Sequence, residues 1–321
     1  MNYTAMHPSM QGTFGNMVKW VMRLRIPLGT AWLFFLAITL SAQTATLAPP
    51  EQLADGALLY RLDDPSLLDP PGAVAVQALK LDPRKMTLEI GRGPGAEPPR
   101  MTVDAIAARR AGVIAAVNAG FFSLETGRPT NFLKIGGKVV SGTGRPRGAV
   151  GWFERRGETT LVFDRVAVSN PGKGRLEYKP LIGSPQDWLR VQYGVSGAGL
   201  LMLDGRELTE WSDERITAGF DTTRHPRTVI GTDAQGAVWL ITVDGRNPAI
   251  SLGMSFTELQ RLSNRLGLRS VLNLDGGGST TMWVGGKIIN HPSDLTGPRP
   301  VSDAILVIPR KRQAKAAGEE Q

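Results

Sequence analysis

The stretch SFTELQRLSNRLGLRSVLNLDGGGSTT, residues 255–281, joins a helix, a strand and a glycine-rich turn. Ser255 and Glu258 form a capping box at the start of the helix, and Gly267 ends it. Residues 270–274 then predict a buried strand that runs into Asp275 and three glycines. The helix has one apolar face, made of Phe256, Leu259, Leu262 and Leu266.

A second, shorter unit repeats this order. Residues 102–110 predict a helix, and residues 113–117 predict a strand that ends at Asn118. Gly136-Gly137 and Gly285-Gly286, each flanked by β-forming residues, predict hairpin turns. We therefore predict a single domain of α+β class, with mixed β-sheets and a few flanking helices. Other short apolar runs bounded by turn residues predict strands at 86–90, 161–163, 200–203, 238–243 and 304–308.

The composition excludes several classes of protein. With 321 residues, 41% hydrophobic and 21% charged, the chain is an ordinary globular protein and not a disordered, collagenous or coiled-coil one. It has no cysteine, which excludes a disulfide scaffold, a thiolate metal site and a cysteine nucleophile. Only three histidines are present, so we expect neither a poly-histidine zinc centre nor another metal cofactor.

The N-terminal segment is typical of a secretory signal. Lys19, Arg23 and Arg25 precede the apolar run 27–40, after which small residues follow. A start at Met22 would give such a signal its usual length, and an uncleaved membrane anchor is the alternative. We expect an exported protein, periplasmic or extracellular. The predicted organisation is a signal peptide or anchor over 1–42, a linker over 43–71, a domain over 72–309 and a basic disordered tail over 310–321.

The net charge of +8 is a weak indication of nucleic-acid binding. Part of it lies in the leader, and part lies in Arg310, Lys311, Arg312 and Lys315 of the tail. We therefore expect a sugar-phosphate or polysaccharide partner and no nucleic acid, whereas the oligomeric state stays open.

Asp275 and the three glycines that follow it are the strongest candidate site. Gly276, Gly277 and Gly278 permit close approach of a ligand, and their successive N–H groups could form an anion-binding nest. Asp275 would face that ligand, with the hydroxyls of Ser279 and Thr280 as donors. The alternative is a tight turn in which Asp275 caps its own backbone.

Two Asp-Gly-Arg segments follow buried strands, at Asp244 and at Asp204. Asp-Gly between β-strands is also a common hairpin turn, and the residue types do not separate the two.

Several single residues have two interpretations. Arg227 could bind a phosphate or carboxylate in a bidentate manner, or it could be an exposed strand residue. Asn118 could hydrogen-bond a sugar hydroxyl or hold a turn. Arg299 could be another phosphate ligand or a solvated arginine, and His291 could be an acid or base or simply a loop residue.

Taken together, four motifs resemble those of the phosphodiester glycosidase family, in its bacterial exported branch. They occur in the family's order and the resemblance covers about residues 72–309. It implies hydrolysis of the C1–O bond of a sugar-1-phosphodiester, and it selects Asp244 over Asp204. The motifs are Ala116–Phe122, Pro226–Gly231, Val243–Arg246 and Leu272–Thr280.

Under this hypothesis Asp275 and Asp244 are the catalytic candidates, as nucleophile or base. Asn118 and Arg246 would hold the sugar or phosphate, and Arg227 with the glycine nest would stabilise charge. Two alternatives stay open. One is a metal-dependent phosphodiesterase that cleaves P–O with Asp244, Asp275 and Asp303 as ligands, and the other is a non-catalytic polysaccharide-binding envelope protein.

Overall fold

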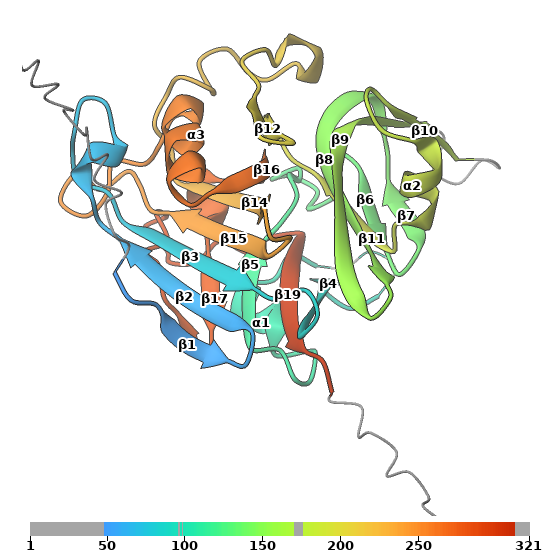
Figure 1. The fold of residues 1–321 in the computed structure, drawn as a ribbon, viewed down its shortest axis with the longest axis horizontal. Coiled ribbons are helices and arrows are strands. Elements are labelled where there is room, and N and C mark those ends of the chain that lie inside the picture. The colour runs from blue at the N-terminus through green and yellow to red at the C-terminus, as the bar shows by residue number, and fades with distance from the viewer. Residues whose placement is uncertain (1–47, 96, 98, 170–175, 312–321) are drawn as a thin grey trace, which may run out of the picture. The chain divides into compact units, whose positions relative to one another are not determined.

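A computed structural model describes residues 48–311 except 96, 98 and 170–175. The predicted signal or anchor over 1–42 and most of the predicted tail lie outside the described residues. Within the described part, nineteen strands form three sheets, and three α-helices lie against them (Figure 1). No helix in this part of the chain is long and apolar enough to span a membrane.

The largest sheet has eight strands and carries the strand that leads to Asp275. Its order is β1-β2-β3-β15-β14-β16-β12-β13. The strands are β1 (Glu51–Ala54), β2 (Ala57–Leu62), β3 (Val76–Leu81), β12 (Leu200–Leu203), β13 (Arg206–Glu207), β14 (Arg227–Asp233), β15 (Val238–Val243) and β16 (Leu268–Asn273).

Two smaller sheets complete the fold. The six-stranded sheet has the order β10-β9-β8-β11-β6-β7, and the five-stranded sheet has the order β18-β17-β5-β19-β4. The first contains β6 (Leu133–Ile135), β7 (Lys138–Ser141), β8 (Thr143–Arg155), β9 (Glu158–Ser169), β10 (Glu177–Pro180) and β11 (Tyr193–Ser196). The second contains β4 (Met86–Arg92), β5 (Ala115–Asn118), β17 (Met282–Val284), β18 (Lys287–Ile288) and β19 (Asp303–Pro309).

The prediction of sheets with few helices is confirmed, but the domain is largely β. The strand pairs between described residues are antiparallel, so the sheets are not mixed as we predicted. Short hairpins account for the pairs of consecutive strands, because two antiparallel strands need only a tight turn between them. Other pairs, such as β19 with β4 and β15 with β3, join strands that are far apart in the sequence. Gly136-Gly137 and Gly285-Gly286 form two such turns, with positive φ at all four glycines.

Strand β15 explains how the sheets share a core. Val238 and Leu240 face a core to which all three sheets contribute. Trp239, Ile241 and Val243 face the opposite side, toward helix α3 (Phe256–Arg265). Because alternate side chains point to opposite faces of a strand, a sheet covered on both faces requires a continuous apolar sequence. All six residues of β15 are buried, which is the pattern that its sequence predicts.

The helices cover the outer faces of the sheets (Figure 1). Helix α3 begins at the predicted capping box, in which the Ser255 and Glu258 side chains both accept backbone N–H groups. Helix α1 (Val103–Ala107) is shorter than the predicted 102–110 and packs on β5 and β19. Helix α2 (Pro185–Arg190) was not predicted, although its N-cap Ser184 followed by a proline is a usual helix start.

The predicted linker over 43–71 needs correction. Strands β1 and β2 lie within it and extend the eight-stranded sheet, since β2 pairs with β3 along six residues. The two strands form a hairpin around Asp55-Gly56, with Gly56 at φ 91°. The domain therefore begins at about residue 51, where its first strand begins. At the other end, Arg310 donates to Thr159, so the first residue of the predicted tail packs on the domain.

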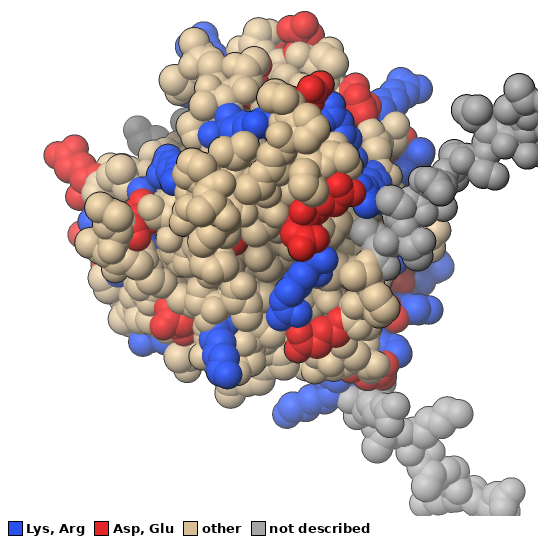
Figure 2. Space-filling model, turned by 90° about the vertical axis from the view of Figure 1, so that its left-hand side faces the viewer, with Lys and Arg blue, Asp and Glu red and all other residues tan. Residues whose placement is uncertain are grey.

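Charged side chains are interspersed on one face of the molecule. Figure 2 shows basic and acidic groups side by side on a mostly uncharged surface. Ion pairs such as Arg61–Glu51 and Lys85–Asp55 neutralise part of the charge of strands β1 to β3. No single-sign field forms on this face.

Candidate active site

Five strand ends meet at one place in the fold. Strands β5, β15 and β16 end there, and β14 and β19 begin there. Pairing joins the ends of β14, β15 and β16 in the eight-stranded sheet and those of β5 and β19 in the five-stranded sheet. Hydrogen bonds of Asn118 with Asp275 and Thr228 connect the two sets. Each strand then continues into a loop. The loops that carry the predicted motifs therefore lie next to one another.

Asn118 fastens these strand ends together. Its Nδ2 donates to the Asp275 carbonyl at 2.7 Å. Its Oδ1 accepts from the Thr228 hydroxyl at 2.7 Å and from the Thr281 N–H at 3.1 Å. The side chain is fully buried. The structure contains the alternative in which Asn118 holds a turn, because its side chain positions the Asp275 loop, and the sugar contact stays a prediction.

The three glycines after Asp275 fit a crowded backbone. A Cβ at Gly276 would lie 2.6 Å from the Pro226 carbonyl oxygen. Gly277 has φ of 61°, in the left-handed region that side chains avoid. The prediction that the backbone geometry of this turn requires glycine is confirmed.

The predicted anion nest is not formed by these glycines. The Gly276 N–H donates to the Asp275 carboxylate at 2.9 Å, and the Gly277 N–H donates to Pro226 at 2.8 Å. Two of the three amides are therefore already occupied. The alternative interpretation, in which Asp275 caps its own backbone, is the one that the structure contains.

The Asp275 carboxyl group is perturbed by burial. Burial raises its pKa to about 7, because desolvation disfavours the charged form. The Ser279 hydroxyl, the Gly276 N–H and the Arg299 charge offset only part of this effect, and the negative charge of Asp303 adds to it. A carboxyl group with a pKa raised in this way holds a proton more readily near neutral pH than an ordinary aspartate, which suits an acid–base catalyst.

Arg246 lies over the glycine loop. A Cβ at Gly277 would be 3.0 Å from its Nη2, and its Nη1 donates to the Ser293 hydroxyl at 3.5 Å. Its φ is 62°, a backbone conformation that costs a non-glycine residue roughly 1–3 kcal/mol. Since the side chain is exposed, its guanidinium is available to an anionic ligand.

Asp294 and Arg299 form an ion pair directly above Gly278. Arg299 donates to both carboxylate oxygens, with Nε to Oδ2 at 2.8 Å and Nη2 to Oδ1 at 3.0 Å. A Cβ at Gly278 would lie 2.1 Å from Asp294 Oδ1 and 2.2 Å from Arg299 Nη2. The sequence interpretation of Arg299 as a loop residue missed this contact, which explains why position 278 is glycine.

Asp244 binds His291 through both of its oxygens. Oδ1 accepts from the His291 N–H at 2.9 Å and from Asn290 Nδ2 at 2.9 Å. Oδ2 lies 3.2 Å from His291 Nδ1. A carboxylate only accepts, so this contact places the ring proton on Nδ1 and leaves Nε2 free. Asp244 is buried, whereas 64% of the His291 side chain is exposed.

A cavity of about 300 Å³ adjoins this pair. Asp244, Arg246, His291 and Asp294 are among its walls. Asp275 is not, but Arg246 joins the cavity to the glycine loop by its contact with Gly277. The group that reaches this cavity next to Asp244 is therefore His291, a residue whose site role the sequence indicated only weakly.

Arg227 is a structural residue. Its Nε donates to the Met254 carbonyl at 2.8 Å, and its Nη2 donates to the carbonyls of Phe220 and Thr223. The guanidinium lies between the rings of Phe220 and Phe256, at 4.5 and 4.9 Å from their centroids. It is fully buried, and burial lowers its pKa to about 9. Its Nη1 is buried and has no hydrogen-bond partner among the described residues, and the phosphate contact of Arg227 stays a prediction.

The hydroxyl residues and a further aspartate lie deeper. Ser279 and Thr280 are buried, so their predicted role as ligand donors lacks an exposed hydroxyl. Asp303 is fully buried, with Oδ1 accepting from the Gly120 N–H at 2.7 Å. Burial raises its pKa as well. The sequence signal for Asp303 was its position as a charged residue at the start of a buried strand.

Asp204 is a hairpin residue. It joins β12 to β13 with φ of 51°, and Gly205 follows with φ of 83°. Two successive positive φ angles are typical of a type I′ hairpin turn. Asp244 is in no such hairpin, because β15 continues through a loop to α3. In the part of the chain that the structure describes, no three His, Asp or Glu side chains gather to hold a metal ion.

The fold and the site define a largely β-sheet protein with a carboxyl group, a glycine loop and arginines at one end of its sheets. Comparison with known proteins places it more narrowly. The chain belongs to the phosphodiester glycosidase family, whose model matches residues 111–308. The prediction of this family is confirmed.

Individual relatives agree with this assignment. N-acetylglucosamine-1-phosphodiester alpha-N-acetylglucosaminidase of Bos taurus is 29% identical over 229 residues, which are 67% of this chain and 41% of the relative. The Homo sapiens protein of the same name is 27% identical, over 67% of this chain and 42% of its own. The chain thus spans about two fifths of the length of these curated relatives.

Solved structures share the fold. The zebrafish N-acetylglucosamine-1-phosphodiester alpha-N-acetylglucosaminidase catalytic domain superposes with a TM-score of 0.59 at 22% identity, covering 83% of this chain and 87% of that domain. A hypothetical protein from Synechocystis superposes with a TM-score of 0.64 at 19% identity, covering 82% of this chain and 64% of its own.

Proposed function

We propose that this protein is an exported glycosidase that hydrolyses the C1–O bond of a sugar-1-phosphodiester in an envelope or extracellular glycan. Family membership and the names of the relatives support a hydrolase of this type. The observation that carries the proposal is the Asp275 carboxyl, whose pKa is raised to about 7 on a loop covered by Arg246. Export rests on the basic and apolar segment before residue 42.

Asp275 acts as nucleophile or general base in this proposal. Glycoside cleavage passes through an oxocarbenium-like state, which a carboxylate stabilises or attacks. When the C1–O bond breaks, the leaving group is a phosphate monoester, which needs little help from a proton donor. The Arg246 guanidinium then stabilises the charge that develops on the departing phosphate. The Arg299–Asp294 pair holds the loop beneath it.

Asp244 acts through His291. The carboxylate fixes the ring by Nδ1, and the free Nε2 accepts or delivers a proton at the cavity. This assigns Asp244 to positioning rather than to attack on the sugar, because its side chain is 2% exposed. Asn118 and Arg227 hold the strand ends on which these loops stand.

One experiment distinguishes the proposed glycosidase from two alternative functions. The full chain is incubated with a panel of sugar-1-phosphodiesters in ¹⁸O-water, with and without EDTA. Label at the anomeric oxygen of the sugar, unchanged by EDTA, is the expected result. Label in the phosphate, with loss of turnover in EDTA, would instead identify a metal-dependent phosphodiesterase. Glycan binding without turnover of any diester would identify a polysaccharide-binding protein.

A further inference from the structure

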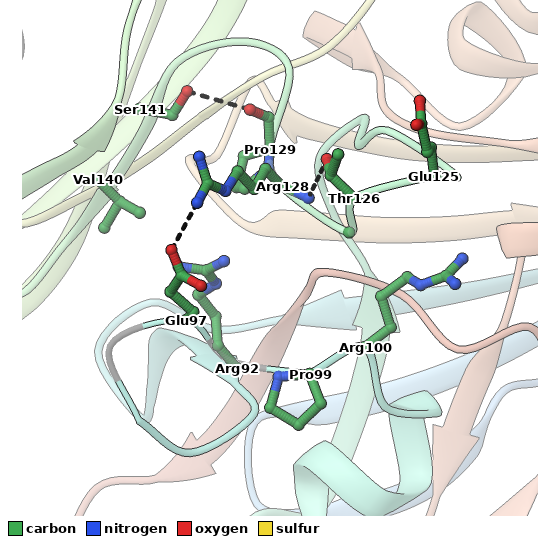
Figure 3. A pocket seen from close by; sticks show the side chains of 11 residues that line it. Arg92, Glu97, Pro99, Arg100, Glu125, Thr126, Arg128, Pro129, Val140 and Ser141 are labelled. Carbon is green, nitrogen blue, oxygen red and sulfur yellow. Dashed lines mark hydrogen bonds and ion pairs between the residues drawn. The ribbon is translucent and has the colours of Figure 1, made fainter.

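A second cavity, of about 530 Å³, shares no lining residue with the cavity at Asp244 and His291. Its walls come from the loop after β4, the loop after β5 and the edge strand β7 (Figure 3). Three arginines line it: Arg92, Arg100 and Arg128. A volume of this size is in the range of small-molecule sites.

Two of these arginines have no carboxylate partner among the described residues. Arg128 pairs with Glu97 at 2.5 Å, and Figure 3 shows this contact at the mouth of the cavity. Arg92 and Arg100 form no ion pair with any described side chain. Glu125, the other acidic residue of the lining, is exposed. Three arginines and two glutamates line the cavity, so it keeps an excess of one positive charge.

Arg92 and Arg100 are held in place without being neutralised. Arg92 is half-buried, and its Nε donates to the Ser302 carbonyl at 3.4 Å. The Arg100 guanidinium lies 6.0 Å from the Phe122 ring centroid. A Cβ at Gly127 would lie 3.0 Å from Arg100 Cγ, so the arginine stem rests on that glycine. The chain therefore contacts the Arg92 head group and the Arg100 stem, and the Arg100 guanidinium is exposed at the cavity.

We propose that this cavity binds a phosphate group carried by a sugar or glycan chain. A guanidinium fork matches two oxygens of a phosphate, and three arginines around one cavity can contact several of its oxygens. The cavity volume exceeds that of a single phosphate and leaves room for the attached sugar. The sugar component rests on the proposed function, whereas phosphate binding needs no turnover.

The position of the cavity connects it to the candidate site. Arg92 opposes Asp303 across strands β4 and β19, and the Asp303 charge in turn raises the pKa of Asp275. Arg92 and Arg100 lie before residue 111, where the match to the family begins. The cavity is therefore built partly from residues outside the family match, and it would recognise an additional phosphate of the ligand.

The test is a titration followed by the backbone amide NMR signals of the full chain. Thr126 and Gly127 report on the cavity, and Gly277 and Gly278 report on the candidate site. The ligands are glucose 6-phosphate, inorganic phosphate and glucose. We expect glucose 6-phosphate to shift Thr126 and Gly127 at lower concentration than phosphate does, and glucose to shift neither.

Two double variants distinguish phosphate binding at this cavity from a general effect of the protein's charge. The double variant Arg100→Gln/Arg128→Gln should weaken the binding reported by Gly127 at least tenfold. The control Arg155→Gln/Arg190→Gln removes the same charge from another cavity. It should change the ligand affinity reported by Gly127 less than twofold. All four arginines are exposed, so both double variants should keep the fold.

Several results would overturn the inference. They are an unchanged affinity in the first double variant, equal shifts with glucose, equal affinity for phosphate and glucose 6-phosphate, or shifts confined to Gly277 and Gly278. The last result would leave the proposed function intact, because an anion would then bind only at the candidate site. Conversely, failure of turnover would not affect phosphate binding at Gly127.

Discussion

The Asp244 carboxylate holds both the backbone and the ring of His291. It accepts the His291 N–H at 2.9 Å and lies 3.2 Å from Nδ1 of the same residue. One buried carboxylate therefore fixes the position and the tautomer of an exposed imidazole. Asp244 and His291 should act as one unit.

Asp244→Asn should lower kcat roughly 10²–10⁴-fold, the usual range for a lost acid–base function. The NH2 group that replaces one carboxylate oxygen cannot accept a hydrogen bond from the ring N–H, so His291 loses its orientation. His291→Gln should cost about as much, and the double variant little more than either single variant, since residues that act as a unit are not additive. The measurement is single-turnover kinetics on a sugar-1-phosphodiester.

Asp204→Asn is the matched control for this prediction. Asp204 is exposed in a hairpin turn, and asparagine tolerates the same left-handed backbone. It should leave kcat and stability unchanged. Strictly additive losses in Asp244→Asn and His291→Gln would contradict the coupling.

Asp275→Asn should abolish turnover while the protein stays folded. It should also remove a pH dependence of stability. The folded-state pKa of about 7 lies above the ordinary Asp value, so the folded state binds more protons than the unfolded state between about pH 4 and 7. The free energy of unfolding of the wild type therefore falls as pH rises through that window.

Urea unfolding at pH 5 and pH 8 measures this effect. The wild type should lose on the order of 1–4 kcal/mol more than Asp275→Asn over that interval, since one pKa unit corresponds to about 1.4 kcal/mol. Other titrating groups are common to both proteins and cancel. Equal losses in the two proteins, or wild-type turnover in the folded variant, would show that Asp275 is not the perturbed catalytic group.

Gly278→Ala should lower kcat/KM roughly 10–100-fold with little loss of stability. The new Cβ displaces the Asp294–Arg299 pair, whose side chains are partly exposed and can move away. The loop under Arg246 then loses its clamp. Steady-state kinetics and a thermal melt check both parts. Gly144→Ala is the control, because a Cβ there meets no atom within 4 Å; a similar loss in that variant would contradict the prediction.

Truncation of Arg246 should lower activity without lowering stability, whereas truncation of Arg227 should lower stability. Arg246→Ala removes an exposed cation and should cost about 1.5–3 kcal/mol of transition-state binding, which is roughly 10- to 100-fold in kcat/KM, at unchanged stability. Arg227→Ala removes a buried guanidinium from three carbonyls and two aromatic rings, and should destabilise the protein by about 3–5 kcal/mol. A phosphate-binding role for Arg227 would appear instead as lost affinity in a protein of normal stability.

Local patterns predicted much of the secondary structure. Helix α3, the two Gly-Gly hairpins and the buried strands follow from periodicity, capping and turn residues, which act over a few neighbouring positions. Strands β1 and β2 were missed because their short, half-exposed sequences resemble a linker. The Asp55-Gly56 turn between them was the available signal.

The sequence by itself determined the Asp275 loop, because three successive glycines are needed wherever backbone and side chains crowd one turn. Residue types in similar local settings did not separate Asp244 from Asp204, a pair for which only the resemblance to the family gave a preference, and they did not separate Arg227 from Arg246. The tertiary structure decided these. Asp244 meets His291 47 positions away, and Asn118 meets Asp275 157 positions away. Such contacts, and the burial that sets their pKa values, depend on which strand ends meet, and no local pattern records that.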